Sequence, residues 1–103
     1  MEARDAKEPG GQRLLVEGTL GIADVAALKG RILEALRSCR ELELDLGAVE
    51  ECDTAGIQLL VATGRLAEQD GRAVRLGRCS EAVGSAAARL GVSLMTSDSE
   101  RGD

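Results

Sequence analysis

Thr54 lies in a short stretch of this chain where residue types and spacing point to chemistry. It follows Asp53 and precedes Ala55 and Gly56, and a hydrophobic helical pattern begins directly afterwards. A threonine hydroxyl becomes a nucleophile when an adjacent base activates it, yet the chain contains no histidine. The stretch therefore fits two roles: a helix cap, or an acceptor of phosphate delivered by a separate kinase.

The acidic residues suggest an enzymatic site, but other residues that such a site needs are missing. Asp45, Asp53 and Thr54 suggest phosphotransfer to an aspartate, but a receiver-type site needs an acidic cluster and a lysine near the later strands. The two lysines, Lys7 and Lys29, lie early in the chain. Neither a G-x-x-x-x-G-K-[ST] nor a G-x-G-x-x-G string is present. We therefore expect a protein that is not an enzyme.

Metal and anion sites also lack their usual residues. The three cysteines are widely spaced, without a C-x-x-C pair or a histidine to complete a zinc site. We expect reduced, mostly buried thiols at Cys39, Cys52 and Cys79. The loop at Thr54 and the start of a helix at Ser80 can together hold an anion, but no specific polar cluster supports this ligand-binding alternative. We expect no cofactor and no metal.

Composition excludes several kinds of partner. The chain has 103 residues, 44% of them hydrophobic, so it can bury the core of a single domain. It contains no Phe, Tyr or Trp to stack on a base, and its net charge is −5. Nucleic acid is therefore not expected as a partner. No stretch reads as a signal peptide or a membrane span, which predicts a cytoplasmic protein without membrane insertion.

Hydrophobic periodicity predicts alternating strands and helices. The expected elements are strands at 13–17 and 19–22, a helix at 23–38, a strand at 41–46, a helix from about 57 to Asp70-Gly71, a strand at 73–76 and a helix at 83–90 capped by Ser80. Residues 47–52 are expected as a loop, and 92–95 as a last strand or an apolar tail.

The order of these elements predicts the fold class. Alternating strands and helices favour an α/β domain with a mixed, mostly parallel sheet of about four to five strands. Because 41–46 alternates leucines with acids, one sheet face is expected to be wet and the helices to pack mainly on the other. The expected organisation is a flexible segment at 1–12, the domain at 13–95 and a flexible tail at 96–103.

The spacing also places individual side chains. The acids of residues 41–46 are expected on the solvated face, offset by Arg13 and Arg75 on neighbouring strands. We expect Thr54 to be exposed at or next to the N-cap of a helix. The residues expected in the core include Leu44, Leu46, Leu60 and Val74. A partner would contact the solvent-facing side of the second helix, at Gln58, Ala62 and Arg65.

Several segments together resemble one family. Residues 45–49 read D-L-G-A-V and residues 53–60 read D-T-A-G-I-Q-L-L, with V-E-G-T-L upstream at 16–20. Downstream, residues 76–80 read L-G-R-C-S and residues 90–92 read L-G-V. This order is similar to that of STAS domains (sulfate transporter and anti-sigma factor antagonist). The similarity covers nearly the whole predicted domain.

The resemblance implies a regulatory binding module, bacterial and mostly without catalysis. In anti-sigma factor antagonists the Ser or Thr after the motif aspartate is phosphorylated by a partner serine kinase, itself the anti-sigma factor. The unmodified form binds that partner and frees the sigma factor. Thr54 occupies the acceptor position here. The residues expected to bind the partner are Asp53, Thr54, Ala55, Gly56 and Gln58.

Two departures leave other branches of the family open. The acceptor is Thr rather than the commoner Ser, and Gly21 stands where many antagonists carry Asp. The D-T-A-G string is also similar to the cytoplasmic STAS subunit that binds the ATPase of the Mla phospholipid-trafficking ABC transporter. A third branch accompanies chemotaxis systems. The sequence does not show to which of these three branches the chain belongs, and it does not fix the oligomeric state.

Overall fold

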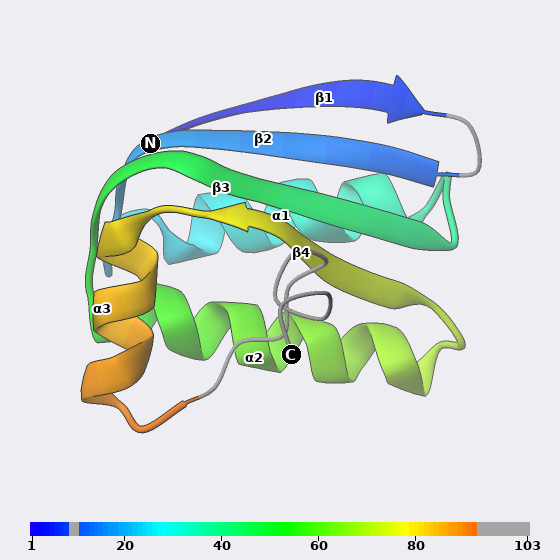
Figure 1. Cartoon of the computed structure of the whole chain (residues 1–103). Coiled ribbons are helices and arrows are strands. Elements are labelled where there is room, and N and C mark those ends of the chain that lie inside the picture. Colours follow the sequence, from blue (N-terminus) through cyan, green and yellow to red (C-terminus); the bar gives the residue numbers. More distant parts are fainter. Residues whose placement is uncertain (9–10, 93–103) are drawn as a thin grey trace, which may run out of the picture.

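In the part of the chain that the computed structural model describes, residues 1–8 and 11–92, four strands form one sheet and three helices lie against it (Figure 1). The elements are β1 (Glu2–Glu8), β2 (Gly11–Leu20), α1 (Val25–Leu36), β3 (Glu41–Cys52), α2 (Thr54–Gln69), β4 (Ala73–Cys79) and α3 (Glu81–Arg89).

The sheet is mixed, with the strand order β1-β2-β3-β4. β1 runs antiparallel to β2, while β2, β3 and β4 are parallel and are connected by α1 and α2. Figure 1 shows α1 and α2 beneath the sheet and α3 beside the end of β4. The predicted α/β class, with its helices mainly on one face, is confirmed.

The N-terminal segment differs from the prediction. Instead of a flexible lead-in over 1–12, residues 2–8 form strand β1, paired with β2 from Glu2 opposite Glu17 to Glu8 opposite Gly11. Arg4 forms an ion pair with Glu17 at 3.1 Å. Charged residues are common on edge strands because they discourage pairing with other chains. The same charges make such a strand look like a flexible tail in the sequence.

Two predicted interruptions of strands are also wrong. β2 is one continuous strand rather than two short ones, because Gly18 adopts a φ of +88° beside a register shift and bends the strand without ending it. The predicted loop at 47–52 belongs to β3, which stays paired with β2 as far as Leu20 opposite Cys52. These pairings lie far apart in sequence, so local patterning does not reveal them.

The helices lie close to their predicted positions. α2 ends at the predicted junction, where Gly71 has the left-handed φ of +72° that suits a residue after a helix. Ser80 caps α3 as predicted, because its Oγ accepts a hydrogen bond of 3.3 Å from the N–H of Val83. Residues 93–95 of the predicted last strand or tail, and the predicted tail at 96–103, lie outside the described residues.

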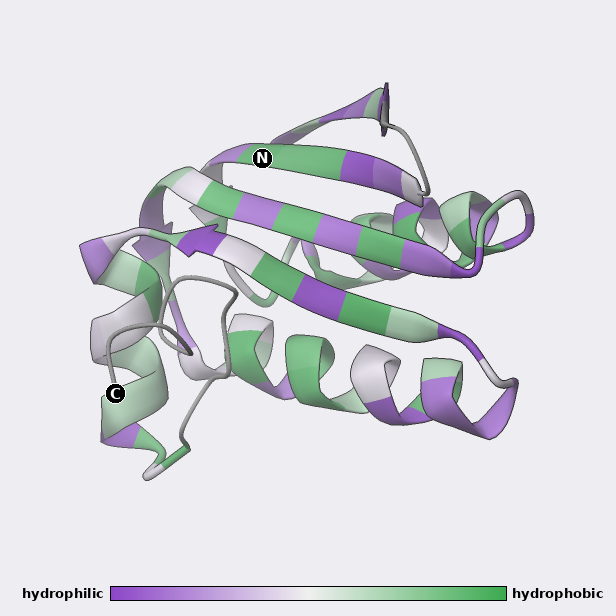
Figure 2. Cartoon of the chain, turned by 45° about the vertical axis from the view of Figure 1, so that its right-hand side comes forward, coloured by the Kyte–Doolittle hydropathy of each residue, from purple (hydrophilic) through white to green (hydrophobic). Residues whose placement is uncertain are grey.

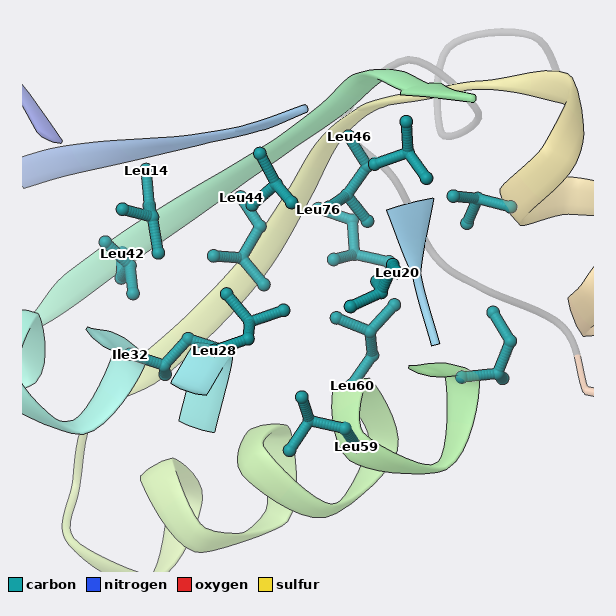
Figure 3. Packing of buried hydrophobic residues seen from close by; sticks show 14 of the residues in the cluster. Leu14, Leu20, Leu28, Ile32, Leu42, Leu44, Leu46, Leu59, Leu60 and Leu76 are labelled. Atoms are coloured by element: carbon teal, nitrogen blue, oxygen red, sulfur yellow. The ribbon is translucent and has the colours of Figure 1, made fainter. Parts of the chain in front are cut away.

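The core is aliphatic and centred on leucine. Figure 3 shows side chains from β2, β3 and β4 meeting those of α1 and α2. The residues with fully buried side chains include Leu14, Leu20, Leu28, Ile32, Leu42, Leu44, Leu46 and Ile57. Leu44, Leu46 and Leu60 are buried as predicted. Val74 is only half-buried, because it lies near the start of an edge strand with a neighbouring strand on one side only.

The opposite face of the sheet carries paired charges. Figure 2 shows hydrophobic and hydrophilic residues alternating along β3. Glu43 pairs with Arg13 at 3.4 Å and Glu41 with Arg75 at 3.3 Å, which confirms the predicted cross-strand pairing. Asp45 is more buried than expected, since its side chain is 6% exposed and pairs with Arg78 at 3.0 Å.

The environment of Asp45 favours its charged form. Burial by itself raises the pKa of a carboxyl group. Hydrogen bonds from the Arg78 guanidinium and the Gly47 N–H, with the charges of Arg78 and Arg13, outweigh burial and hold the pKa of Asp45 below its ordinary value. The folded protein therefore binds this proton less readily than the unfolded chain.

Removing one core leucine tests the packing. We expect Leu44→Ala to lower the free energy of unfolding by about 2–5 kcal/mol, because it leaves a cavity where the sheet meets the helices. Ile22→Ala, at a residue that is 71% exposed, should change it by less than about 0.5 kcal/mol. Urea unfolding followed by circular dichroism measures both, and equal losses in the two variants would contradict the packing described.

The lowered pKa of Asp45 predicts a dependence of stability on pH. Its contribution is fully present above the unfolded pKa of about 3.9 and is lost as pH falls through the folded pKa. The stability difference between wild type and Asp45→Asn should therefore shrink as pH is lowered from about 5 towards 2. Urea unfolding at several pH values measures it, and a difference independent of pH would contradict the assigned ionisation.

Candidate functional site

Asp53 connects the end of β3 to the start of α2 and joins both to a second loop. Its backbone is extended, with φ −104° and ψ 179°, and its Oδ1 accepts a hydrogen bond of 3.2 Å from the N–H of Gly56. Its Oδ2 accepts a bond of 3.0 Å from the N–H of Ile22, in the loop between β2 and α1. One carboxylate therefore caps α2 and fixes the neighbouring loop against it.

The loop between β2 and α1 is shaped to reach this carboxylate. Asp24 Oδ2 accepts a bond of 3.1 Å from the N–H of Gly21, and the Asp24 N–H donates to the Gly21 carbonyl at 2.8 Å. A Cβ atom at Gly21 would lie 3.0 Å from Oδ2 of Asp53. The small residue lets the loop approach the start of α2 closely.

Gly56 is needed for close packing at the same junction. A Cβ atom there would lie 2.9 Å from Cγ of Leu20, 3.0 Å from the Leu20 carbonyl oxygen and 3.2 Å from Sγ of Cys52. The first turn of α2 therefore rests directly on the ends of β2 and β3. Gly56 is buried and shapes the junction, so it offers little surface for a partner to contact.

Thr54 is the first residue of α2, and its side chain is exposed as predicted. Because Asp53 supplies the cap, the Thr54 hydroxyl is not needed for it. Within residues 1–8 and 11–92, the hydroxyl has no hydrogen-bond partner. Of the two roles that the sequence left open for Thr54, capping belongs to its neighbour Asp53. The hydroxyl is available to a partner or a kinase.

The surroundings of Thr54 are acidic, although it lies at the positive end of a helix. Glu50, Glu51 and Asp53 precede it in the chain, and all three are exposed. Burial, followed by the charge of Asp53, raises the pKa of the adjacent Cys52 thiol, although Arg89 acts in the opposite direction. The thiol therefore stays protonated near neutral pH and is a poor nucleophile. All three cysteines are half-buried, less than expected.

The structure adds two apolar features to this surface. Gln58, Ala62 and Arg65, predicted as the partner-facing side of the helix, line the second feature, but neither the exposed Ile22 nor a groove was predicted. Ile22 follows the Gly21 turn, and its side chain is 71% exposed although its N–H is bonded to Asp53. A groove of about 280 Å³ also runs along α2, lined by Ile57, Gln58, Val61, Ala62, Arg65, Leu90 and Val92. An apolar residue directly after a loop glycine was the signal for Ile22, whereas the groove depends on how α2 and the end of α3 pack.

The alternative sites are not assembled. Asp45 pairs with Arg78 on the open sheet face, whereas Asp53 is bonded at the start of α2, so they form no joint acidic site. The Ser80 hydroxyl is engaged in capping α3. Across residues 1–8 and 11–92, no group of three or more metal-ligating side chains is positioned to hold an ion. Within the same residues, no helix has the length and apolar character needed to span a membrane.

Comparison with known proteins gives a family and a fold. Residues 3–96 match the family model described as "Mlab, STAS domain". No curated protein matches the chain. The structure is similar to the anti-sigma factor antagonist SpoIIAA in its unphosphorylated form, with a TM-score of 0.71 and 14% identity over 97% of this chain and 93% of that one.

Two further structures share the fold. A Ser-to-Glu variant of RsbS from Moorella thermoacetica has a TM-score of 0.71 and 24% identity, covering 91% of this chain and 81% of that one. SLC26A9 has a TM-score of 0.64 and 18% identity, over 80% of this chain but 16% of that one. At these identities the likeness shows the fold alone.

The site predicts that Asp53 and Thr54 affect stability very differently. Asp53→Ala removes the cap and the bond to Ile22 and should cost about 1–3 kcal/mol of unfolding free energy. Asp53→Asn, which keeps a capping oxygen, should cost less. Thr54→Ala should change stability by under about 0.5 kcal/mol. Urea unfolding measures all three, and a loss at Thr54 as large as at Asp53→Ala would contradict the division of roles.

Proposed function

Because the chain belongs to the STAS domain family, we propose that it is a non-catalytic regulatory module that binds a protein partner through the start of α2. The observation that carries the proposal is Thr54. Its exposed hydroxyl is without an intramolecular partner in the described part of the chain, on a junction that Asp53 holds in place. The proposed contact residues are Asp53, Thr54, Ala55 and Gln58, with Gly56 shaping the junction.

The first candidate partner is a serine kinase that is itself an anti-sigma factor. Phosphorylation of Thr54 would add about −1.5 to −2 charge units. The positive end of the α2 dipole, with its N–H groups, tolerates that charge. Glu50 and Glu51, exposed near the end of β3, already add negative charge to the segment before Thr54. The added phosphate would repel an acidic partner and block close packing around Ile22, which makes Thr54 a candidate switch.

The chemistry of the junction supports the absence of catalysis. Thr54 is adjacent to acids, the chain contains no histidine, and the raised pKa of Cys52 keeps the nearest thiol protonated. The oxygens of the adjacent Asp53 carboxylate accept bonds from the N–H groups of Gly56 and Ile22, and no side chain among the described residues bonds the Thr54 hydroxyl to activate it. It is better suited to receive a phosphate from an external kinase, or to be buried in an interface, than to attack a substrate.

A second candidate partner is the ATPase of a phospholipid-trafficking ABC transporter. The description of the matching family model, "Mlab, STAS domain", favours it. Gly21 departs from the antagonist pattern, in which many members carry Asp, and a Cβ atom there would lie 3.0 Å from Oδ2 of Asp53. Thr54 would then be an interface residue without phosphorylation. Both candidate partners use ATP, so we propose a cytoplasmic location in a bacterium.

Affinity capture from the organism that encodes the protein tests the proposal. The baits are wild type, Thr54→Glu, Thr54→Val and Ser85→Glu, the last a matched charge control on the exposed side of α3. We expect wild type and Ser85→Glu to retain one ATP-binding partner, identified by mass spectrometry, and Thr54→Glu to lose it. Equal capture by Thr54→Glu would contradict the proposed site.

The captured protein separates the two candidates. A kinase should transfer phosphate from ATP to wild type but not to Thr54→Val, because valine keeps the shape of threonine without its hydroxyl. A transporter ATPase should bind without transferring phosphate, and Thr54→Val should weaken its binding. Capture of neither class by wild type would contradict both candidates.

A further inference from the structure

A second groove lies between α1 and α2, near the opposite end of α2 from Thr54. It has a volume of about 470 Å³, and Leu33 of α1 and Leu66 of α2 line it. Leu66 follows Thr54 by twelve residues on the same helix, roughly 18 Å along its axis at 1.5 Å per residue. A partner in this groove would therefore leave the surface at Thr54 accessible.

The groove exposes large apolar side chains. Leu33 is 40% exposed and Leu66 is 41% exposed, and they are two of the four exposed large hydrophobic residues in the described part of the chain. The other two, Ile22 and Leu90, are on the surfaces near the start of α2 and the end of α3. Two leucines from neighbouring helices thus form an apolar floor that is partly open to solvent.

The residues that line the groove around these leucines are mainly positively charged, although the protein as a whole is negatively charged. The net charge is −5, yet Lys29, Arg37 and Arg72 line the groove with a single acid, Asp70. Within residues 1–8 and 11–92, neither Lys29 nor Arg37 pairs with a carboxylate. These two cations are therefore available to an external acid.

The groove is held in shape by a contact between the turns at its end. The Arg72 guanidinium donates hydrogen bonds to the carbonyl oxygens of Leu36 and Cys39, the latter at 2.8 Å. These carbonyls belong to the end of α1 and the turn after it, where backbone oxygens lack helical partners. Arg72 thus ties the segment after α2 to the end of α1, so the groove is formed before a partner arrives.

We infer that this groove binds a helix of a partner protein whose face presents leucine-like side chains flanked by Asp or Glu. An amphipathic helix places apolar side chains at spacings of three and four, which suits a groove between two helices. Acids on its flanks would meet Lys29 and Arg37, which favours the correct partner and speeds its association. The inference assigns a second interaction surface, separate from the surface at Thr54.

Designed peptides of defined charge test the inference. One is an amphipathic helix with leucines on one face and glutamates on its flanks, and its twin carries lysines instead of the glutamates. The readout is the methyl NMR spectrum of the full chain with labelled leucines, in which Leu33→Ile and Leu66→Ile assign the two groove signals. We expect the glutamate peptide to shift both signals saturably and the lysine peptide to bind at least about tenfold more weakly.

Charge reversal in the protein provides the matched comparison. Lys29→Glu with Arg37→Glu should weaken the glutamate peptide by about tenfold or more and strengthen the lysine peptide. Lys7→Glu with Arg89→Glu changes the net charge equally outside the groove and should have less effect. Because the lysine peptide should gain affinity, misfolding cannot explain the expected result, and circular dichroism checks the fold of both variants.

Three results would overturn the inference. They are equal binding of both peptides, no shift at Leu33 or Leu66, and groove signals that already move with protein concentration alone, which would make the groove a contact between copies. Thr54→Glu should bind the glutamate peptide as wild type does. The test therefore stands or falls independently of the function proposed for the start of α2.

Discussion

The carboxylate of Asp53 is the interaction on which the described surface depends. Its Oδ1 receives the N–H of Gly56 and its Oδ2 the N–H of Ile22, so a single side chain holds the start of α2 against the loop between β2 and α1. Without it the exposed N–H of Ile22 would turn to water, and the N–H of Gly56 would keep only its bond of 3.1 Å to the Asp53 carbonyl oxygen. The pairing ties the loop that carries the exposed Ile22 side chain to the junction that carries the exposed Thr54.

This arrangement separates the residue that builds the surface from the residue that can change it. Asp53 supplies the capping oxygen, which frees the Thr54 hydroxyl from any structural duty in the described part of the chain. Gly21 and Gly56 let the backbone segments approach, because a Cβ atom at either position would press on Asp53 or Leu20. Modification of Thr54 can therefore alter the chemistry of the surface while the fold beneath it persists.

Local patterning was enough to predict several features. The alternation of leucines and acids gave β3 its core and wet faces, and the positions of Gly71 and Ser80 marked where α2 ends and α3 begins. The placement of Thr54 at a helix start also followed from residue types. Each of these features is decided within a few residues of the chain, so the sequence expresses it directly.

Features set by distant pairing could not be predicted in this way. The sequence of β1 is as rich in charge as a flexible terminal segment, and it forms a strand because it pairs with the edge of β2. β3 continues past Leu46 because it stays paired with β2. The bond from Ile22 to Asp53 joins residues 31 positions apart. The groove between α1 and α2 arises from the packing of the two helices, and no short sequence motif predicts it.

The most direct test of the account is amide hydrogen exchange at Gly56 and Ile22, measured by NMR in wild type, Asp53→Ala and Thr54→Glu. The account predicts that both amides are protected in wild type and equally protected in Thr54→Glu, whereas Asp53→Ala loses protection at Ile22 and weakens it at Gly56. Loss of protection in Thr54→Glu would contradict the account. It would mean that a charge at Thr54 acts by opening the junction rather than by changing its surface.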